Sequence, residues 1–416
     1  MSSIPIDLIV EIFLRLPSKS VARFRCVSKQ WGSILYRPDF TELFLTRSSA
    51  LPRLLFVVKF DRGDFHLFSS LQPQNPYGKQ SSLLVTADFR MKFNRYLFLS
   101  LCQYASGLIY FLHERTKIRD KWRSHEERDV LHAICNPSTG QYAVLPELKR
   151  DRCTDFFLGF DPIDKQFKVL SIVAYRFSDN RILTLGPEEL RWRKIHSPLT
   201  HRPLSQGICI DGVLYYLSRR TDDDTSYAVV CFDVRSENFK FLDEEVFPSS
   251  CPILINYKGK LGLFFRKYDV ADAIKLCLWV LDDVEKHEWS KYAFYISGDD
   301  DNKIDDCQNV NVVGVAATTG EIVLAEKPSC ISKPFYVFYF NPEKNTLQRV
   351  EIQGLGFGLG KFCYEDRYFV EVFVDYAEDL NVNDAKIFKP SQGLDIIWKR
   401  PIPQHPEEVR DQRDMS

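Results

Sequence analysis

The stretch IPIDLIVEIFLRLPSKSVARFRCVSKQWGSIL, residues 4–35, mixes apolar residues at helical spacing with basic residues and has a proline, Pro17, near its middle. Its first apolar series recurs at intervals of three and four residues and consists of Leu8, Ile9, Ile12, Phe13 and Leu16. Such a series is typical of an amphipathic helix. Pro5 suits the first turn of that helix because it lacks an amide hydrogen, and Pro17 is expected to end it.

Two further short helices are predicted after this proline. Ser18 and Ser28 are each placed to cap one of them, and Pro38 is expected to end the helical segment. Three short helices make a unit of about 45 residues, which is close to the size below which a hydrophobic core alone is marginal. We therefore expect the unit to lean on a partner or on the rest of the chain.

The composition of the whole chain limits what it binds. The chain has 416 residues, enough for two or three domains, and its 55 basic and 56 acidic residues leave a formal net charge of -1. A chain with this balance has no global positive field that would attract nucleic acid or anionic lipid. We expect neither nucleic acid nor a membrane as a partner.

The cysteines and the apolar runs indicate the compartment. Eleven cysteines are scattered without any CxxC spacing, which is typical of reduced thiols and not of a disulfide framework or a zinc site. No apolar run approaches the length of a membrane span, and Asp7 and Glu11 interrupt the apolar residues of the N-terminus. These features predict a soluble protein of the cytoplasm or the nucleus that holds no cofactor.

After about residue 53 the helical spacing is replaced by short runs rich in Val, Ile, Phe, Tyr and Leu, which continue to about residue 375. A hairpin recurs among them, in which Asn or Asp precedes a polar turn and a large apolar residue follows six positions later. The clear copies are CNPSTGQY (135–142), FDPIDKQF (160–167), FDVRSENF (232–239) and FNPEKNTL (340–347). The Asn or Asp side chain is expected to bond backbone amides of the turn.

The hairpins recur with a period close to fifty residues. With looser copies included, their centres are Asn136, Pro187, Asp233, Asp282 and Asn341, separated by 51, 46, 49 and 59 residues. A second series of turns lies at Gly107, Gly212, Gly259 and Gly320. One four-stranded unit per period predicts a kelch-like β-propeller. Five repeats are visible, and a sixth blade is expected if residues 54–69 pair with residues 362–374; the alternative fold is a β-sandwich with irregular hairpins.

Residues 4–35 closely resemble an F-box, as found at the N-terminus of the large plant F-box family. The matching positions are Pro5, Asp7, Leu8, Glu11, Ile12, Leu16, Pro17, Phe24, Val27, Lys29 and Trp31. The remainder resembles the F-box-associated interaction domain of that family through NPSTG (136–140), GFDPIDKQFKV (159–169), GVLYYL (212–217) and FDVRSENF. The resemblance implies an α+β multidomain protein with a small three-helix F-box at 1–47. An all-β, propeller-like domain of five or six blades follows at 48–395, and a polar tail at 396–416 is expected to be disordered.

An F-box implies docking to the Skp-family adaptor of a cullin-based SCF ubiquitin ligase, with the β domain as the receptor for an unknown target protein. The chain would do no chemistry itself and would raise the effective concentration of target lysines near activated ubiquitin. The alternative is an F-box-containing binding or assembly protein without ubiquitin transfer.

Three sets of side chains follow from the resemblance and the helical spacing. The expected adaptor-binding residues are Pro5, Leu8, Ile9, Ile12, Leu16, Pro17 and Val21. The expected F-box core residues are Phe24, Val27 and Trp31. The basic residues expected to border the interface are Lys19, Arg23, Arg25 and Lys29. If all of these side chains pack only against the β domain, no adaptor surface remains.

No motif for catalysis or metal binding is complete. The string GLGFGLGK (354–361) has Leu355 where a phosphate-binding loop needs Gly, and Phe362 where it needs Ser or Thr. The acidic clusters at 222–224 and 298–306 lack the ligand spacing of a calcium loop, and neither HExxH nor GxSxG occurs. The segment HERTKIRDKWRSHEER (113–128) offsets its basic residues with four acids. We expect no enzyme activity; a propeller enzyme with its site in the central channel is the less favoured alternative.

Overall fold

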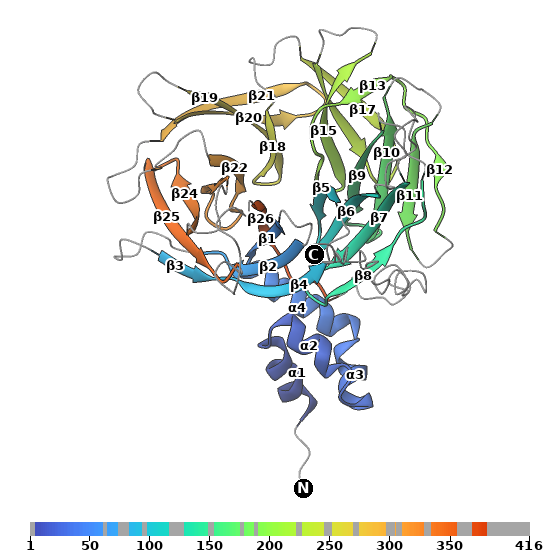
Figure 1. Cartoon of the computed structure of the whole chain (residues 1–416), viewed down its shortest axis with the longest axis vertical. Coiled ribbons are helices and arrows are strands. Elements are labelled where there is room, and N and C mark those ends of the chain that lie inside the picture. Colours follow the sequence, from blue (N-terminus) through green and yellow to red (C-terminus); the bar gives the residue numbers. More distant parts are fainter. Residues whose placement is uncertain are drawn as a thin grey trace, which may run out of the picture.

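A computed structural model describes residues 5–60, 65–73, 83–93, 98–115, 129–148, 154–174, 179–186, 190–221, 227–244, 252–268, 274–296, 304, 310–327, 334–355 and 368–380. Helices at the start of the chain lie at one edge of a ring of β-sheets (Figure 1). They are α1 (Ile6–Leu14), α2 (Ser18–Phe24), α3 (Lys29–Leu35) and α4 (Pro38–Ala50). The helical module therefore has four helices, and the prediction of three was wrong.

Pro38 begins α4 instead of ending the helical segment. It occupies the first turn, where its missing amide hydrogen leaves no intrahelical bond unmade. Ser28 caps α3 as predicted, since its Oγ accepts a hydrogen bond from the Trp31 amide at 3.1 Å. Ser18 is not a cap, because α2 begins at Ser18 itself and the extended backbone of Pro17 supplies the N-cap position.

The described strands form six sheets arranged as the blades of a propeller. In order across the sheet, blade 1 is β26 (Tyr368–Tyr376), β1 (Arg53–Phe60), β2 (Phe65–Leu71) and β4 (Asp88–Phe93). Blade 2 is β5 (Phe98–Ala105), β6 (Leu108–Arg115), β7 (Asp129–Asn136) and β8 (Gln141–Val144). Blade 3 is β9 (Thr154–Asp161), β10 (Gln166–Val173), β11 (Arg181–Leu185) and β12 (Arg193–Lys194).

The remaining blades follow in chain order. Blade 4 is β13 (His201–Pro203) and β14 (Ile208–Ile210), both paired with β15 (Val213–Arg220), then β16 (Tyr227–Asp233) and β17 (Phe239–Glu244). Blade 5 is β18 (Ile253–Tyr257), β19 (Lys260–Tyr268), β20 (Ile274–Asp283) and β21 (Glu288–Ile296). Blade 6 is β22 (Val310–Val315), β23 (Ile322–Glu326), β24 (Phe335–Asn341) and β25 (Thr346–Gln353), with β3 (Leu83–Thr86) added in parallel to β25. The predicted propeller is confirmed, with six blades, and the alternative β-sandwich was wrong.

The ring is closed by the pairing of its last strand with its first. β26 is antiparallel to β1, with Val57 opposite Glu371 and Val58 opposite Val370. The predicted sixth blade therefore exists, and it joins the two ends of the β domain in one sheet. Closure of this kind gives every blade a neighbour on both sides.

The four predicted hairpin turns form through their Asn or Asp side chains. The Oδ1 atom of Asn136 accepts a hydrogen bond from the Ser138 amide at 2.8 Å. The corresponding oxygens of Asp161, Asp233 and Asn341 accept bonds from amides two or three residues ahead. The hairpin FDPIDKQF joins the first two strands of blade 3, whereas the other copies join the third and fourth strands of their blades. The looser copy centred on Pro187 lies outside the described residues.

The glycine series marks the turn between the first and second strands of a blade. Gly107, Gly212 and Gly259 have φ angles of 85°, 84° and 84°, and the residue before each of them also has a positive φ. Two consecutive residues of positive φ make the two-residue turn whose twist matches that of the flanking strands. Because antiparallel strands alternate in direction, the turns of both series lie on one face of the ring.

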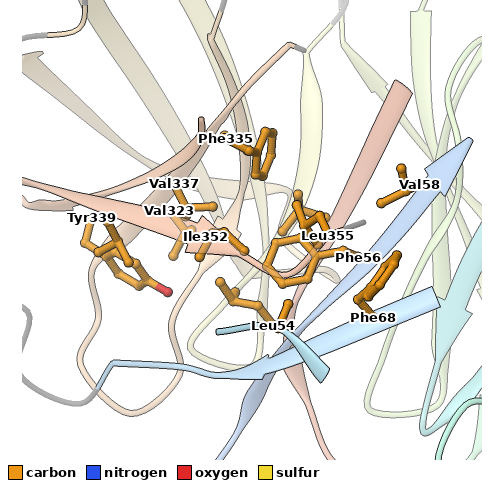
Figure 2. Close-up of a cluster of buried hydrophobic side chains, with 14 of the residues drawn as sticks. Leu54, Phe56, Val58, Phe68, Val323, Phe335, Val337, Tyr339, Ile352 and Leu355 are labelled. Atoms are coloured by element: carbon orange, nitrogen blue, oxygen red, sulfur yellow. The ribbon is translucent and has the colours of Figure 1, made fainter. Parts of the chain in front are cut away.

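A separate hydrophobic layer fills each space between neighbouring blades. Figure 2 shows the layer between blades 6 and 1, where Phe56 meets Phe335 edge to face at a centroid distance of 6.2 Å. Because each sheet is covered on both faces, successive residues of its central strands are buried instead of alternating with exposed ones, as in β10.

His201 allows this packing to be tested through pH. Its side chain is buried, its Nε2 lies 2.8 Å from the Tyr216 hydroxyl, and burial lowers its pKa from 6.5 to about 4. Between these two pH values the unfolded state binds more protons than the folded state, so stability falls as the pH falls. We expect urea unfolding of the wild type to lose up to about 3 kcal/mol from this histidine between pH 6.5 and pH 4.

The variant His201→Gln is the control for that titration. It should show a pH dependence of unfolding that is smaller by the same amount, because glutamine does not titrate. Identical pH profiles for the two proteins would contradict a buried neutral imidazole at this position.

Candidate functional site

The four helices enclose a small hydrophobic core. Its buried members are Phe13, Val21, Leu35, Phe40, Phe44 and, from the end of the described chain, Leu380. Phe13, Phe24 and Trp31 form a triangle of rings with centroid distances of 5.3–5.4 Å. Tilted and edge-to-face contacts between rings stabilise beyond the area that they bury. Three aromatic side chains, one from each helix, therefore hold α1, α2 and α3 together.

One side of α1 stays outside this core. Leu8 and Ile12 are four residues apart and so share one side of the helix, and they are 56% and 52% exposed. Ile6 is also half exposed, and Pro5 and Pro17, which flank the helix, are exposed. We call these five residues the α1 surface. Exposed apolar groups on one element are typical of a surface that a partner covers.

The other expected adaptor-binding residues face inward. Ile9 and Leu16 are partly buried and pack against the core of the helices. Val21 is fully buried. Ser18, Val21 and Phe24 are three residues apart and so lie on one side of α2, and this side of the helix faces the core. Val21 therefore exposes no surface in this structure, and its place in the adaptor-binding set stays an untested prediction.

Val27 is not a core residue, contrary to the prediction, because its side chain is 61% exposed. It lies in the turn after the end of α2 and before the capped start of α3. This turn interrupts the helical spacing between Phe24 and Trp31. The side chain of Val27 therefore does not point in the same direction as theirs. The sequence offered one signal for this break, namely the capping serine, Ser28, directly after it.

The basic residues of this segment are divided between core and surface. Arg25 is buried, where its Nη2 donates to the Leu35 carbonyl oxygen at 2.9 Å and its guanidinium lies 4.3 Å from the centre of the Tyr36 ring. Burial lowers the pKa of the Arg25 guanidinium. Arg25 lies inside the helical module, whereas it was expected at the border of an interface. Lys19 lies over the ring of Phe89 on β4 at 5.4 Å and faces the propeller. The basic residues that are exposed are Arg23 and Lys29.

The remaining sequence motifs add no metal site within the described ranges. No three His, Cys, Asp or Glu side chains in the part of the chain that the structure describes are grouped to hold a metal ion.

None of the described helices is long and apolar enough to cross a membrane. Most of the GLGFGLGK string, nearly all of the acidic clusters, residues 116–128 and the tail at 396–416 lie outside the described residues.

Comparison with known proteins finds a match for each part of the chain. The family model of the F-box domain matches residues 1–43, and that of the F-box associated beta propeller domain matches residues 53–377. The second match is to this propeller family and not to kelch repeats, so the kelch-like description is not supported.

Curated relatives from Arabidopsis thaliana match along nearly the whole chain. F-box protein At3g57590 is 50% identical over 405 residues, which covers 94% of each chain. Putative F-box protein At5g42430 is 51% identical over 389 residues, which covers 91% of each chain. F-box protein At1g47340 is 46% identical over 411 residues, 93% of this chain and 85% of its own.

Two truncations distinguish the exposed from the buried residues of the helical module. Leu8→Ala should change the stability of the helices by less than about 0.5 kcal/mol, because the side chain already meets solvent. Val21→Ala should cost about 2 kcal/mol, because it empties a fully buried position. Hydrogen exchange of the α1–α4 amides measures both changes. Equal costs would contradict the placement of Leu8 on the surface.

Proposed function

The chain belongs to the family of F-box proteins that carry an F-box associated β-propeller domain, and we propose that it is the substrate-recognition subunit of an SCF-type ubiquitin ligase. The helical module would dock a Skp-family adaptor and, through it, a cullin, while the propeller would hold a target protein. The observation that carries the proposal is the α1 surface. Leu8 and Ile12 are apolar side chains that the module does not use for its own core.

The α1 surface has the composition of an interface centre with a polar edge. The ion pair between Glu11 and Arg15, at 2.9 Å, is exposed and lies on the same side of α1 as Leu8 and Ile12. Fully burying an apolar side chain contributes roughly 1.5–3 kcal/mol, whereas an exposed ion pair contributes little. A partner that covers Leu8 and Ile12 would gain this energy without disturbing the aromatic triangle of the core.

The proposed role needs no chemistry from this chain. An adaptor held by the helices and a target held by the propeller would be brought together at a high effective concentration, which favours reaction of target lysines with activated ubiquitin. A short connection supports this role, because effective concentration is lost when a linker is long and flexible. Only Leu51 and the buried Pro52 stand between the end of α4 and the start of β1.

Binding to a purified Skp-type adaptor tests the proposal. We expect the full chain to bind, and the double variant Leu8→Ala/Ile12→Ala to raise the Kd about 30-fold or more, because central apolar side chains dominate interface energies. Leu84→Ala is a matched control, since Leu84 is also half exposed but lies on β3 of the propeller. Isothermal titration calorimetry measures all three Kd values.

Three outcomes would count against the proposal or part of it. If the wild type does not bind, the adaptor role is wrong. If the control variant loses as much affinity as the double variant, the α1 surface is not the docking site. If the cellular half-life of a bound target is unchanged by the double variant, the chain assembles proteins without promoting ubiquitin transfer.

A further inference from the structure

The chain that leaves the closing strand β26 runs into the helical module. Leu380 is only 1% exposed and belongs to the same buried cluster as Phe13, Phe40 and Phe44. The core of the helices, which begins with residues near the N-terminus, is therefore completed by a residue that follows the last strand of the propeller.

Glu378 joins the helices to blade 1. Its amide donates to the Ser48 Oγ of α4 at 2.6 Å, and its carboxylate forms an ion pair with Arg90 of β4 at 2.5 Å. Arg90 also donates from Nε to the Ser69 Oγ of β2 at 2.7 Å. The side chains of Arg90 and Glu378 are 3% and 9% exposed, and a buried charge that loses its partner is strongly destabilising.

Neighbouring residues attach the same segment to blade 2. Asn136 donates from Nδ2 to the Asp379 carbonyl oxygen at 3.0 Å. The hydroxyl of the fully buried Tyr376 lies 2.6 Å from the Ser138 Oγ in the same turn. One short stretch, residues 376–380, therefore contacts blade 1, blade 2 and the helical module, and we call it the C-terminal clasp.

The clasp is attached to the strand that closes the ring. β26 pairs with β1 up to Tyr376, which stands opposite Arg53. Just before the clasp, the Asp375 carboxylate accepts a hydrogen bond at 3.0 Å from the Ala317 amide, in the β22–β23 turn of blade 6. The clasp therefore reaches the helices in its observed position only when blades 6, 1 and 2 are assembled around β26.

We propose that the clasp makes the folding of the helical module depend on closure of the propeller. A helical unit of about 45 residues is marginal alone, and here its core and its α4 contacts need Leu380 and Glu378. Until β26 pairs with β1, these residues are not held beside the helices and the module lacks part of its core. A consequence that rests on the proposed function is that the adaptor-docking module is complete only in a chain whose receptor domain has closed.

Two glycines provide a matched pair of substitutions that disturb different blade boundaries. A Cβ at Gly314 on β22 would lie well inside contact distance of Val374 Cγ2 on β26, at the boundary where the ring closes. A Cβ at Gly159 on β9 would meet Val234 Cγ2 in the same way, at the boundary between blades 3 and 4. Both glycines are buried, and neither belongs to the helical cluster. Only the first substitution acts on the strand that carries the clasp.

Hydrogen exchange of the full chain then tests the coupling. We expect Gly314→Ala to speed the exchange of α1–α4 amides at least about tenfold, because it weakens the strand that positions the clasp. Gly159→Ala should speed exchange near β9 and β16 while changing the helices less than about twofold. Equal effects of the two variants on the helices, or no effect of Gly314→Ala on them, would overturn the proposal.

A direct change in the clasp keeps the proposal testable if Gly314→Ala does not fold. Leu380→Ala should speed exchange in α1–α4 at least about tenfold and leave blades 3 to 5 unchanged, because the cavity lies in the helical core. Leu263→Ala, at an equally buried leucine of blade 5, should do the reverse. Slow exchange of the helices in Leu380→Ala would show that the module does not need the clasp.

These measurements do not use the adaptor, so their outcome is independent of the proposed function. If the chain fails to bind a Skp-type adaptor but shows the expected exchange, the proposed coupling through the clasp stands and only its consequence for adaptor docking is rejected. If the chain binds the adaptor and shows no coupling, the proposed receptor role stands and the proposed coupling through the clasp is rejected.

Discussion

The pairing of β26 with β1 is the interaction on which the rest of the structure depends. It brings Tyr376 opposite Arg53, and so places the end of the propeller beside the point where the chain arrives from α4. Two interblade layers include side chains of β26, namely Val372 in the layer towards blade 6 and Tyr376 in the layer towards blade 2. Without this strand both layers would be uncovered on one side. The apolar side chains left in contact with water would make the assembled ring less stable.

The helical module illustrates how a small unit divides its apolar residues between stability and binding. On α1, Ile9 and Phe13 face the core, while Leu8 and Ile12, each one position earlier, face outward. The aromatic triangle and the contribution of Leu380 allow the core to do without the outer pair. The residues proposed to touch an adaptor can therefore be apolar without being needed for folding, which is what a docking surface on a marginal unit requires.

Much of the propeller could be predicted because its signals are local. The carboxylate or amide of a turn residue such as Asp161 bonds an amide two residues ahead, and the paired positive φ angles at turns such as Asp211 and Gly212 concern adjacent residues. Repetition of these signals at a nearly constant period indicated the blades. The short strand β3 was missed, because its pairing with β25 joins residues that are distant in sequence and the segment has no turn signal of its own.

The helical module was predicted less accurately, because Pro38 was expected to end the helices although it begins α4, and because the buried sides of the helices were misjudged. Periodicity showed that α1 and α2 carry apolar stripes, but two adjacent stripes on one helix have the same period. Which stripe is buried depends on the element packed against it, so Val21 was placed outside, while Val27, in a turn that breaks the period, was placed inside. Turn chemistry, the positions of the first three helices and the repeat period were thus readable from the amino acids alone, since they depend on neighbours within a few residues. The buried sides of the helices and the ion pair of Arg90 with Glu378 were decided only by tertiary structure, because burial and charge pairing depend on what the fold brings close in space.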